Sequence, residues 1–163
     1  MADVPASSQL ARLRQKAAKA RRSRYVDCHL DDIGVVVRYG PITLDQVETV
    51  NRRAGSPIAR NISVLVEACL AILTFDDGQL VSLDPDGTCW VDDDGHIQGE
   101  ALTFASSRTA ELLEVDSASD AVRLLYREAN VEPQIGRDAD DVVHMSTGDT
   151  RRMSRPMGAG NSR

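Results

Sequence analysis

The segment Arg60–Phe75 is the only stretch of the chain that is apolar on nearly every side, and Glu67 alone interrupts its aliphatic run Val64–Leu73. Such a segment is typical of a protein core. It is too short and too closely flanked by charge to span a membrane, which takes about 20 apolar residues. Its length and its Glu, Ala and Leu content predict a helix over about Ala59–Thr74, with Asn61 as a candidate cap. A buried strand is the competing interpretation, because periodicity does not separate the two over a short run.

The residues before this helix have the pattern of a β-hairpin. Polar and apolar residues alternate in Tyr25–Leu30, which predicts a half-buried strand. Asp31–Gly34 supplies a turn, and Gly34–Tyr39 is rich in the β-branched residues that favour a returning strand. Pro41 ends that strand, because proline has no N–H to donate.

Helical spacing and capping residues predict five further helices. Thr43 and Gln46 form a capping box in front of one, and Ser117 marks the start of another. The five are a basic helix ending near Arg22, Leu44–Ala54, a short helix from Ser106 or Ser107 to Leu113, one from Ser117 to about Ala129, and Gln134–Met145.

Three Asp-Gly pairs divide Phe75–Ile97 into a predicted β-meander, because aspartate and glycine tolerate the positive φ of hairpin turns. Its strands are Gln79–Leu83 and Thr88–Val91, followed by a last short strand at Leu102–Phe104. The fold class is therefore α+β: a small, mainly helical domain with an N-terminal hairpin and a short acidic meander. We expect a basic helical arm over residues 1–24, one domain over 25–146 and a disordered basic tail over 147–163.

Charge is distributed unevenly along the chain. The formal net charge is −6, yet residues 1–24 carry seven basic side chains and one acidic one. Eight acidic residues and no Lys or Arg lie between Asp76 and Glu100. This distribution indicates either solvated surfaces or an electrostatic contact with a charged partner or within the protein. The arm has no aromatic residue for stacking and no DNA-reading motif, so nucleic-acid binding is not expected.

The sequence contains no recognisable catalytic or metal-binding constellation. Its three cysteines form no C-x-x-C, which favours reduced thiols in a cytoplasmic protein. The histidines, His29, His96 and His144, are not spaced as a helical metal pair, and no G-x-S-x-G, phosphate-binding glycine loop or H-E-x-x-H occurs. No frame of the acidic segment supplies the final glutamate of an EF-hand, so its Asp-Gly pairs are interpreted as turns. We expect no enzymatic activity, no cofactor and no bound metal.

Four stretches together resemble a known family. They are the Arg/Lys/Ala helix leading into VDCHL, the strand segment GVVVRYGPIT, the segment NISVLVEACLAILTFDDGQLVSLDP, and TAELLEVDSASDAVRLLY. Spanning about Leu10–Tyr126, they resemble the tail assembly chaperones of long-tailed bacteriophages, especially those of actinobacterial hosts. The resemblance implies a non-enzymatic protein that binds the tape-measure protein during tail morphogenesis, helps to recruit tail tube subunits and then leaves. It also implies a location in the cytoplasm of the infected host and absence from the mature virion.

Chaperoning a long amphipathic helix requires an apolar groove or a self-associating scaffold. Two weakly apolar stripes are candidates for this contact, unless they simply pack on the domain. The first is Leu10, Leu13 and Ala17, and the second is Ile135, Ala139 and Val142. Two other classes remain open: a structural head-tail connector or tail-completion subunit retained in the virion, and a small DNA-binding regulator that uses the basic arm.

Overall fold

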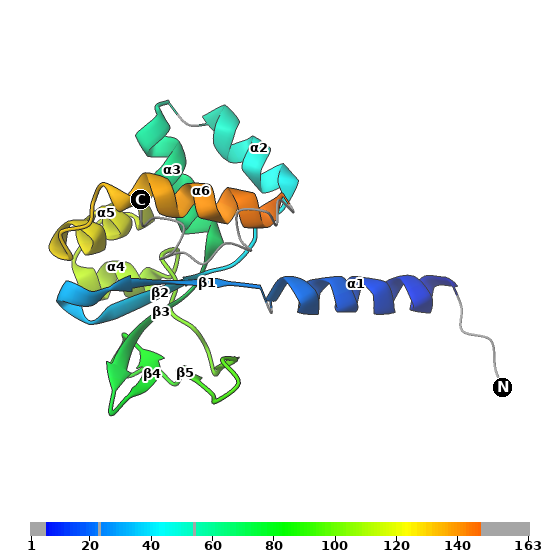
Figure 1. The fold of residues 1–163 in the computed structure, drawn as a ribbon, viewed down its shortest axis with the longest axis horizontal. Helices are drawn as coiled ribbons and strands as arrows, with labels where there is room; N and C mark the ends of the chain where they lie inside the picture. Colours follow the sequence, from blue (N-terminus) through cyan, green and yellow to red (C-terminus); the bar gives the residue numbers. More distant parts are fainter. Residues whose placement is uncertain (1–5, 23, 54, 148–163) are drawn as a thin grey trace, which may run out of the picture.

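A computed structural model describes residues 6–22, 24–53 and 55–147, which form an α+β fold. These residues contain six α-helices and one six-stranded antiparallel sheet whose strands follow chain order (Figure 1). Apart from Thr147, the predicted basic tail lies outside the described residues. The elements are α1 (Ala6–Arg22), β1 (Val26–Leu30), the 3₁₀ turn η1 (Asp31–Ile33), β2 (Val35–Tyr39), α2 (Leu44–Arg53), α3 (Pro57–Ala68), β3 (Cys69–Asp76), β4 (Gln79–Ser82), β5 (Trp90–Val91), β6 (Ile97–Gln98), α4 (Ser107–Leu113), α5 (Ala118–Glu128) and α6 (Gln134–Ser146).

The predicted N-terminal hairpin is confirmed as β1 and β2. Its antiparallel register pairs Asp27 with Arg38 across the two strands. The η1 turn ends at Gly34, whose φ of 66° would strain a residue with a side chain. All five residues of β2 are buried, because this strand lies between β1 and β3.

The single long helix predicted over Ala59–Thr74 is wrong in its second half. Helix α3 ends at Ala68, and the chain passes directly into β3, the strand that hydrogen-bonds with both β2 and β4. The competing strand interpretation is correct for this half. Burial on all sides satisfies helix and strand patterns equally, so pairing with two neighbouring strands decides the outcome. The helix is capped by Ser56, whose hydroxyl accepts a hydrogen bond from the Ala59 N–H, and not by Asn61.

The sheet has a hydrophobic core on each face. Residues that face one another in antiparallel strands share a face, so Val37 and Ile72 lie on one side and Val36 and Leu73 on the other. Helices α3, α5 and α6 cover the first side and build the larger core with it (Figure 1). The smaller core on the second side consists of Val36, Ala71, Leu73 and Cys89, surrounded by Leu80, Val91, Ile97 and Ala101.

The meander curls back under the first strands of the sheet. Arg38, which is only 3% exposed, donates to the Gly95 carbonyl in the β5–β6 turn. It also forms a two-pronged ion pair with Asp27, at 2.8 and 3.1 Å, and lies 3.7 Å from the centre of the Tyr25 ring. A buried guanidinium requires such partners, because an unpaired charge inside a protein is costly. This cluster therefore fixes the β5–β6 hairpin against β1 and β2.

Most of the other predicted elements are present, with some corrections. The capping box forms, as Thr43 and Gln46 each accept the other's backbone N–H. The helical spacing of Leu44, Val47 and Val50 predicts that all three face inward, but Leu44 is 62% exposed. The expected strand at Leu102–Phe104 is not a strand, although the Leu102 carbonyl accepts one hydrogen bond from the Ile72 N–H. In the meander, β4 ends at Ser82, one residue before the predicted end. Strand β5 covers only Trp90–Val91 of the predicted Thr88–Val91, and it pairs with β6, a strand that was not predicted.

Candidate functional site

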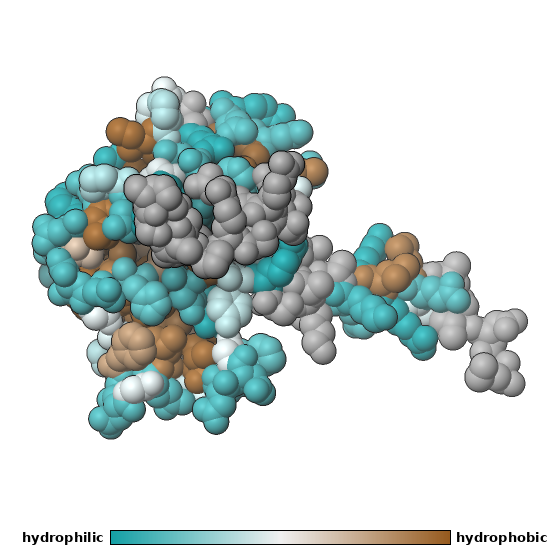
Figure 2. Space-filling model, viewed as in Figure 1, coloured by the Kyte–Doolittle hydropathy of each residue, from teal (hydrophilic) through white to brown (hydrophobic). Residues whose placement is uncertain are grey.

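Of the two apolar stripes predicted to contact a partner, the one on helix α1 is exposed to solvent. The helix extends away from the rest of the molecule (Figure 1), and every residue from 8 to 16 is exposed. Leu10 is 48% and Leu13 is 63% exposed, between the basic side chains of Arg12, Arg14 and Lys16. Figure 2 shows this hydrophobic surface on the helix, surrounded by hydrophilic surface. Ala17 belongs to the same helix, but its side chain lies outside the described set.

The second predicted stripe is not a surface. Ile135 is 7% exposed, and Ala139 and Val142 are fully buried in the larger core. Helix α6 packs its apolar side against α3 and into the larger core, which removes these residues from any partner. The prediction that Ile135, Ala139 and Val142 form a partner-binding face is therefore wrong. These residues pack within the domain, which was the alternative.

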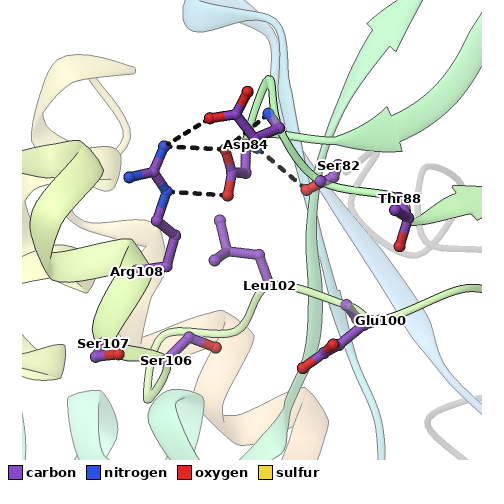
Figure 3. Close-up of a pocket in the computed structure, with 11 residues that line it drawn as sticks. Ser82, Asp84, Thr88, Glu100, Leu102, Ser106, Ser107 and Arg108 are labelled. Atoms are coloured by element: carbon purple, nitrogen blue, oxygen red, sulfur yellow. Dashed lines mark hydrogen bonds and ion pairs between the residues drawn. The ribbon is translucent and has the colours of Figure 1, made fainter.

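A polar cleft of about 500 Å³ lies between the meander and α4. Figure 3 shows the Arg108 guanidinium reaching from α4 to the carboxylate of Asp84, with nitrogen–oxygen distances of 3.0 and 3.3 Å. Hydrogen bonding lowers the pKa of Asp84 and raises the pKa of Arg108. Asp86 and Glu111 also lie within 3.5 Å of the guanidinium.

The groups in this cleft already serve the fold. With three carboxylates around it, the Arg108 side chain has no surplus charge for binding an anion. The Ser82 hydroxyl accepts from the Asp84 N–H, and the Ser106 hydroxyl accepts from the Thr103 N–H. No histidine or cysteine is among the residues that line this cleft, so a serine there has no adjacent base to activate it. The cleft is best explained as an ion-pair contact between α4 and the meander.

The acidic turn before β6 brings Asp92, Asp94 and His96 together, with one potential ligand atom of each within 4.8 Å of the others. One carboxylate oxygen of Asp92 accepts from the backbone N–H groups of Asp94 and His96, and the other accepts from the Gln98 amide. These hydrogen bonds lower the pKa of Asp92. They are the bonds of a side-chain-stabilised turn, which agrees with the interpretation of the Asp-Gly pairs as turns.

A buried polar network joins the hairpin to the last two helices. The Tyr126 hydroxyl donates to Asp138 at 2.8 Å and lies 2.9 Å from the Tyr39 hydroxyl. Burial raises the pKa of Asp138, and it raises the pKa values of both tyrosines well above their ordinary value. This network was not predicted from the sequence, although Asp138 has the helical spacing of the buried stripe Ile135, Ala139 and Val142, which was the available signal.

The three cysteines are poor candidates for chemistry. Burial raises the pKa of the Cys69 thiol to about 12 and also raises the pKa values of Cys28 and Cys89. The thiolate is the reactive form of cysteine, so thiols with raised pKa values remain inert near neutral pH. Every buried side-chain nitrogen or oxygen in the described ranges has a hydrogen-bond partner, as expected of groups that stabilise a fold.

Within the described ranges, none of the helices combines the length and the apolar content that crossing a membrane takes. No protein-family model, curated protein or solved structure matches this chain.

Proposed function

We propose that this protein is a non-enzymatic tail assembly chaperone of a long-tailed bacteriophage, which binds the tape-measure protein in the cytoplasm of the infected host and is left out of the virion. The observation that carries the proposal is the projecting helix α1, which holds Leu10 and Leu13 in solvent among basic side chains. An exposed apolar stripe on a free helix is a binding feature, since amphipathic helices recognise one another through such stripes.

The strength of this contact follows from the exposed leucine surface. Covering a whole leucine side chain contributes about 1.5–3 kcal/mol, so the half-exposed Leu10 and Leu13 together supply about 2–3 kcal/mol. Micromolar binding takes about 8 kcal/mol, so one arm gives a weak and reversible contact. Several copies along one long client would bind more tightly by avidity and would still release one at a time. Basic side chains beside the leucines accelerate association with an acidic client more than they tighten it.

Co-expression with the tape-measure protein of the same phage tests the proposal, with soluble yield and co-purification as the measurements. The wild-type chain is expected to raise the solubility of the tape-measure protein and to co-purify with it. The double variant Leu10→Asp/Leu13→Asp should lose both effects while retaining the circular dichroism and melting temperature of the folded domain. Its matched control is Leu44→Asp/Ile58→Asp, which changes two apolar residues on the body that are at least half exposed.

Failure of the wild-type chain to solubilise or to accompany the tape-measure protein would contradict the proposal. Mass spectrometry of purified virions then tests the structural alternative, because a head-tail connector or tail-completion subunit is present at a fixed copy number. The basic charge of α1 is the feature that favours a DNA-binding regulator. For that class, affinity for DNA should fall steeply as salt is raised.

A further inference from the structure

The meander carries a second surface with exposed aromatic side chains. A groove of about 520 Å³ is lined entirely by residues between Thr74 and Trp90, so none of the helices that the structure describes contributes to its walls. Thr74, Val81 and Trp90 stand opposite one another on β3, β4 and β5, so their side chains share one face of the sheet. Trp90 is 43% exposed, and Phe75 at the rim is 52% exposed. Hydrophobic surface is visible beside the meander in Figure 2.

The charge around this groove is acidic. Asp76, which is exposed, and Asp84, which is paired with Arg108, line the groove, and no Lys or Arg occurs between Asp76 and Glu100. Residues 25–147 carry 23 acidic and eight basic side chains, whereas residues 1–24 carry one acidic and seven basic. The groove therefore combines exposed aromatic surface with negative charge, and α1 combines exposed leucines with positive charge. The two surfaces are complementary in both respects.

The chain that follows α1 is held against the body of the protein at Arg24 and Tyr25. Arg24 donates to the Met145 carbonyl at the end of α6, and the Tyr25 ring stacks on the buried Arg38. With a rise of 1.5 Å per residue, Leu13 and Leu10 lie about 14–18 Å beyond Arg22 along the helix. The helix points away from the body and from the meander of its own copy (Figure 1), so the groove of another copy is the one that its leucines can reach.

We infer that helix α1 of one copy docks in the Thr74–Trp90 groove of a second copy, with Leu10 and Leu13 against Trp90 and Val81 and the basic side chains of α1 beside Asp76. The inference does not depend on the tape-measure protein, because both surfaces belong to this chain. It gives the protein a self-associated form in which the leucines of α1 are covered. A client helix would compete for the same stripe.

Sedimentation of the purified full chain over a concentration series is the first measurement. We expect reversible association in about 0.05 M NaCl that weakens in about 0.5 M NaCl, where charge attraction is screened. Leu10→Asp/Leu13→Asp should raise the dissociation constant at least about 10-fold, since two buried leucines are lost. Asp76→Lys and Trp90→Glu should do the same from the groove side. Asp76→Lys tests the groove even if Trp90→Glu fails to fold, because Asp76 is exposed.

Mixing the variants separates docking between copies from any other contact. The Leu10→Asp/Leu13→Asp chain retains an intact groove, and the Asp76→Lys chain retains an intact arm. Each alone should be monomeric, and the mixture should form a heterodimer through one arm and one groove. Glu128→Lys makes the same charge change on an exposed site of α5 and should leave association unchanged.

Tryptophan fluorescence reports on the groove directly, because Trp90 is the only tryptophan in the chain. Its emission should shift to the blue and its quenching by iodide should fall as the protein concentration rises. A wild-type chain that stays monomeric at low salt would overturn the inference. So would association that survives both arm and groove variants, a mixture that forms no heterodimer, or a Trp90 signal that responds only to the tape-measure protein.

Discussion

The buried hydroxyl of Tyr126 allows a quantitative test of the fold. Replacing Tyr126 by Phe keeps the ring and removes two interactions, one with the Asp138 carboxylate and one with the Tyr39 hydroxyl. A hydrogen bond to a charged group contributes about 1.5–3 kcal/mol and a neutral one about 0.5–1.5 kcal/mol. Tyr126→Phe should therefore lower the free energy of unfolding by about 2–4 kcal/mol. The loss is large because both former partners are buried and each loses a hydrogen-bond partner.

Urea denaturation at neutral pH, followed by circular dichroism, measures this change. Tyr25→Phe is the matched control, because it removes a hydroxyl from a half-buried ring and retains the contact of that ring with Arg38. The control should change the stability by less than about 0.5 kcal/mol. A loss below that value for Tyr126→Phe would refute the reasoning, since it would mean that the network contributes nothing to the folded state.

Four further substitutions test the same network, the core and the η1 turn. Burial raises the pKa of Asp138, so its contribution to stability is present below the ordinary carboxyl pKa and is lost as the pH rises through the higher folded value. Asp138→Asn cannot ionise, and its stability relative to wild type should increase from pH ~3 to ~7 in urea titrations. Leu65→Ala should cost about 2–5 kcal/mol in the same assay, whereas Leu70→Ala should cost less because Leu70 is half-buried. Gly34→Ala should cost about 1 kcal/mol through its positive φ alone, since no atom lies within 4 Å of the added methyl group.

Elements with local start and stop signals could be predicted from the sequence. The Thr43–Gln46 capping box, the serine before α5 and the Asp-Gly turns place their elements within one or two residues. These signals act through backbone groups only a few residues away, so the chain itself carries the information. The α+β class follows from their order.

Long-range contacts explain what could not be predicted. The apolar run after Ala68 is a strand because it pairs with β2 on one side and β4 on the other. Residues within the run do not indicate this pairing. The spacing of Leu44 predicts that it faces inward, but it is exposed, because the orientation of α2 depends on how the helix packs against the rest of the protein. Among the candidate contacts, the exposure of Leu10 and Leu13 agrees with the thin stripe of their helix, whereas the α6 stripe serves the core. The groove at Trp90 depends on the pairing of three strands, which spacing alone does not reveal.

The direct passage from α3 into β3 has a consequence for changes in chain length. No loop separates Ala68 from Cys69, so one inserted residue would either turn α3 by about 100° or move every β3 side chain to the opposite face. Ile72 and Leu73 would then exchange cores. Insertions should instead be tolerated between Leu83 and Cys89, where four consecutive residues are exposed. The junction thus fixes which side of α3 faces the sheet and which side chains of β3 face each core. Evolution can therefore lengthen this protein only away from the junction.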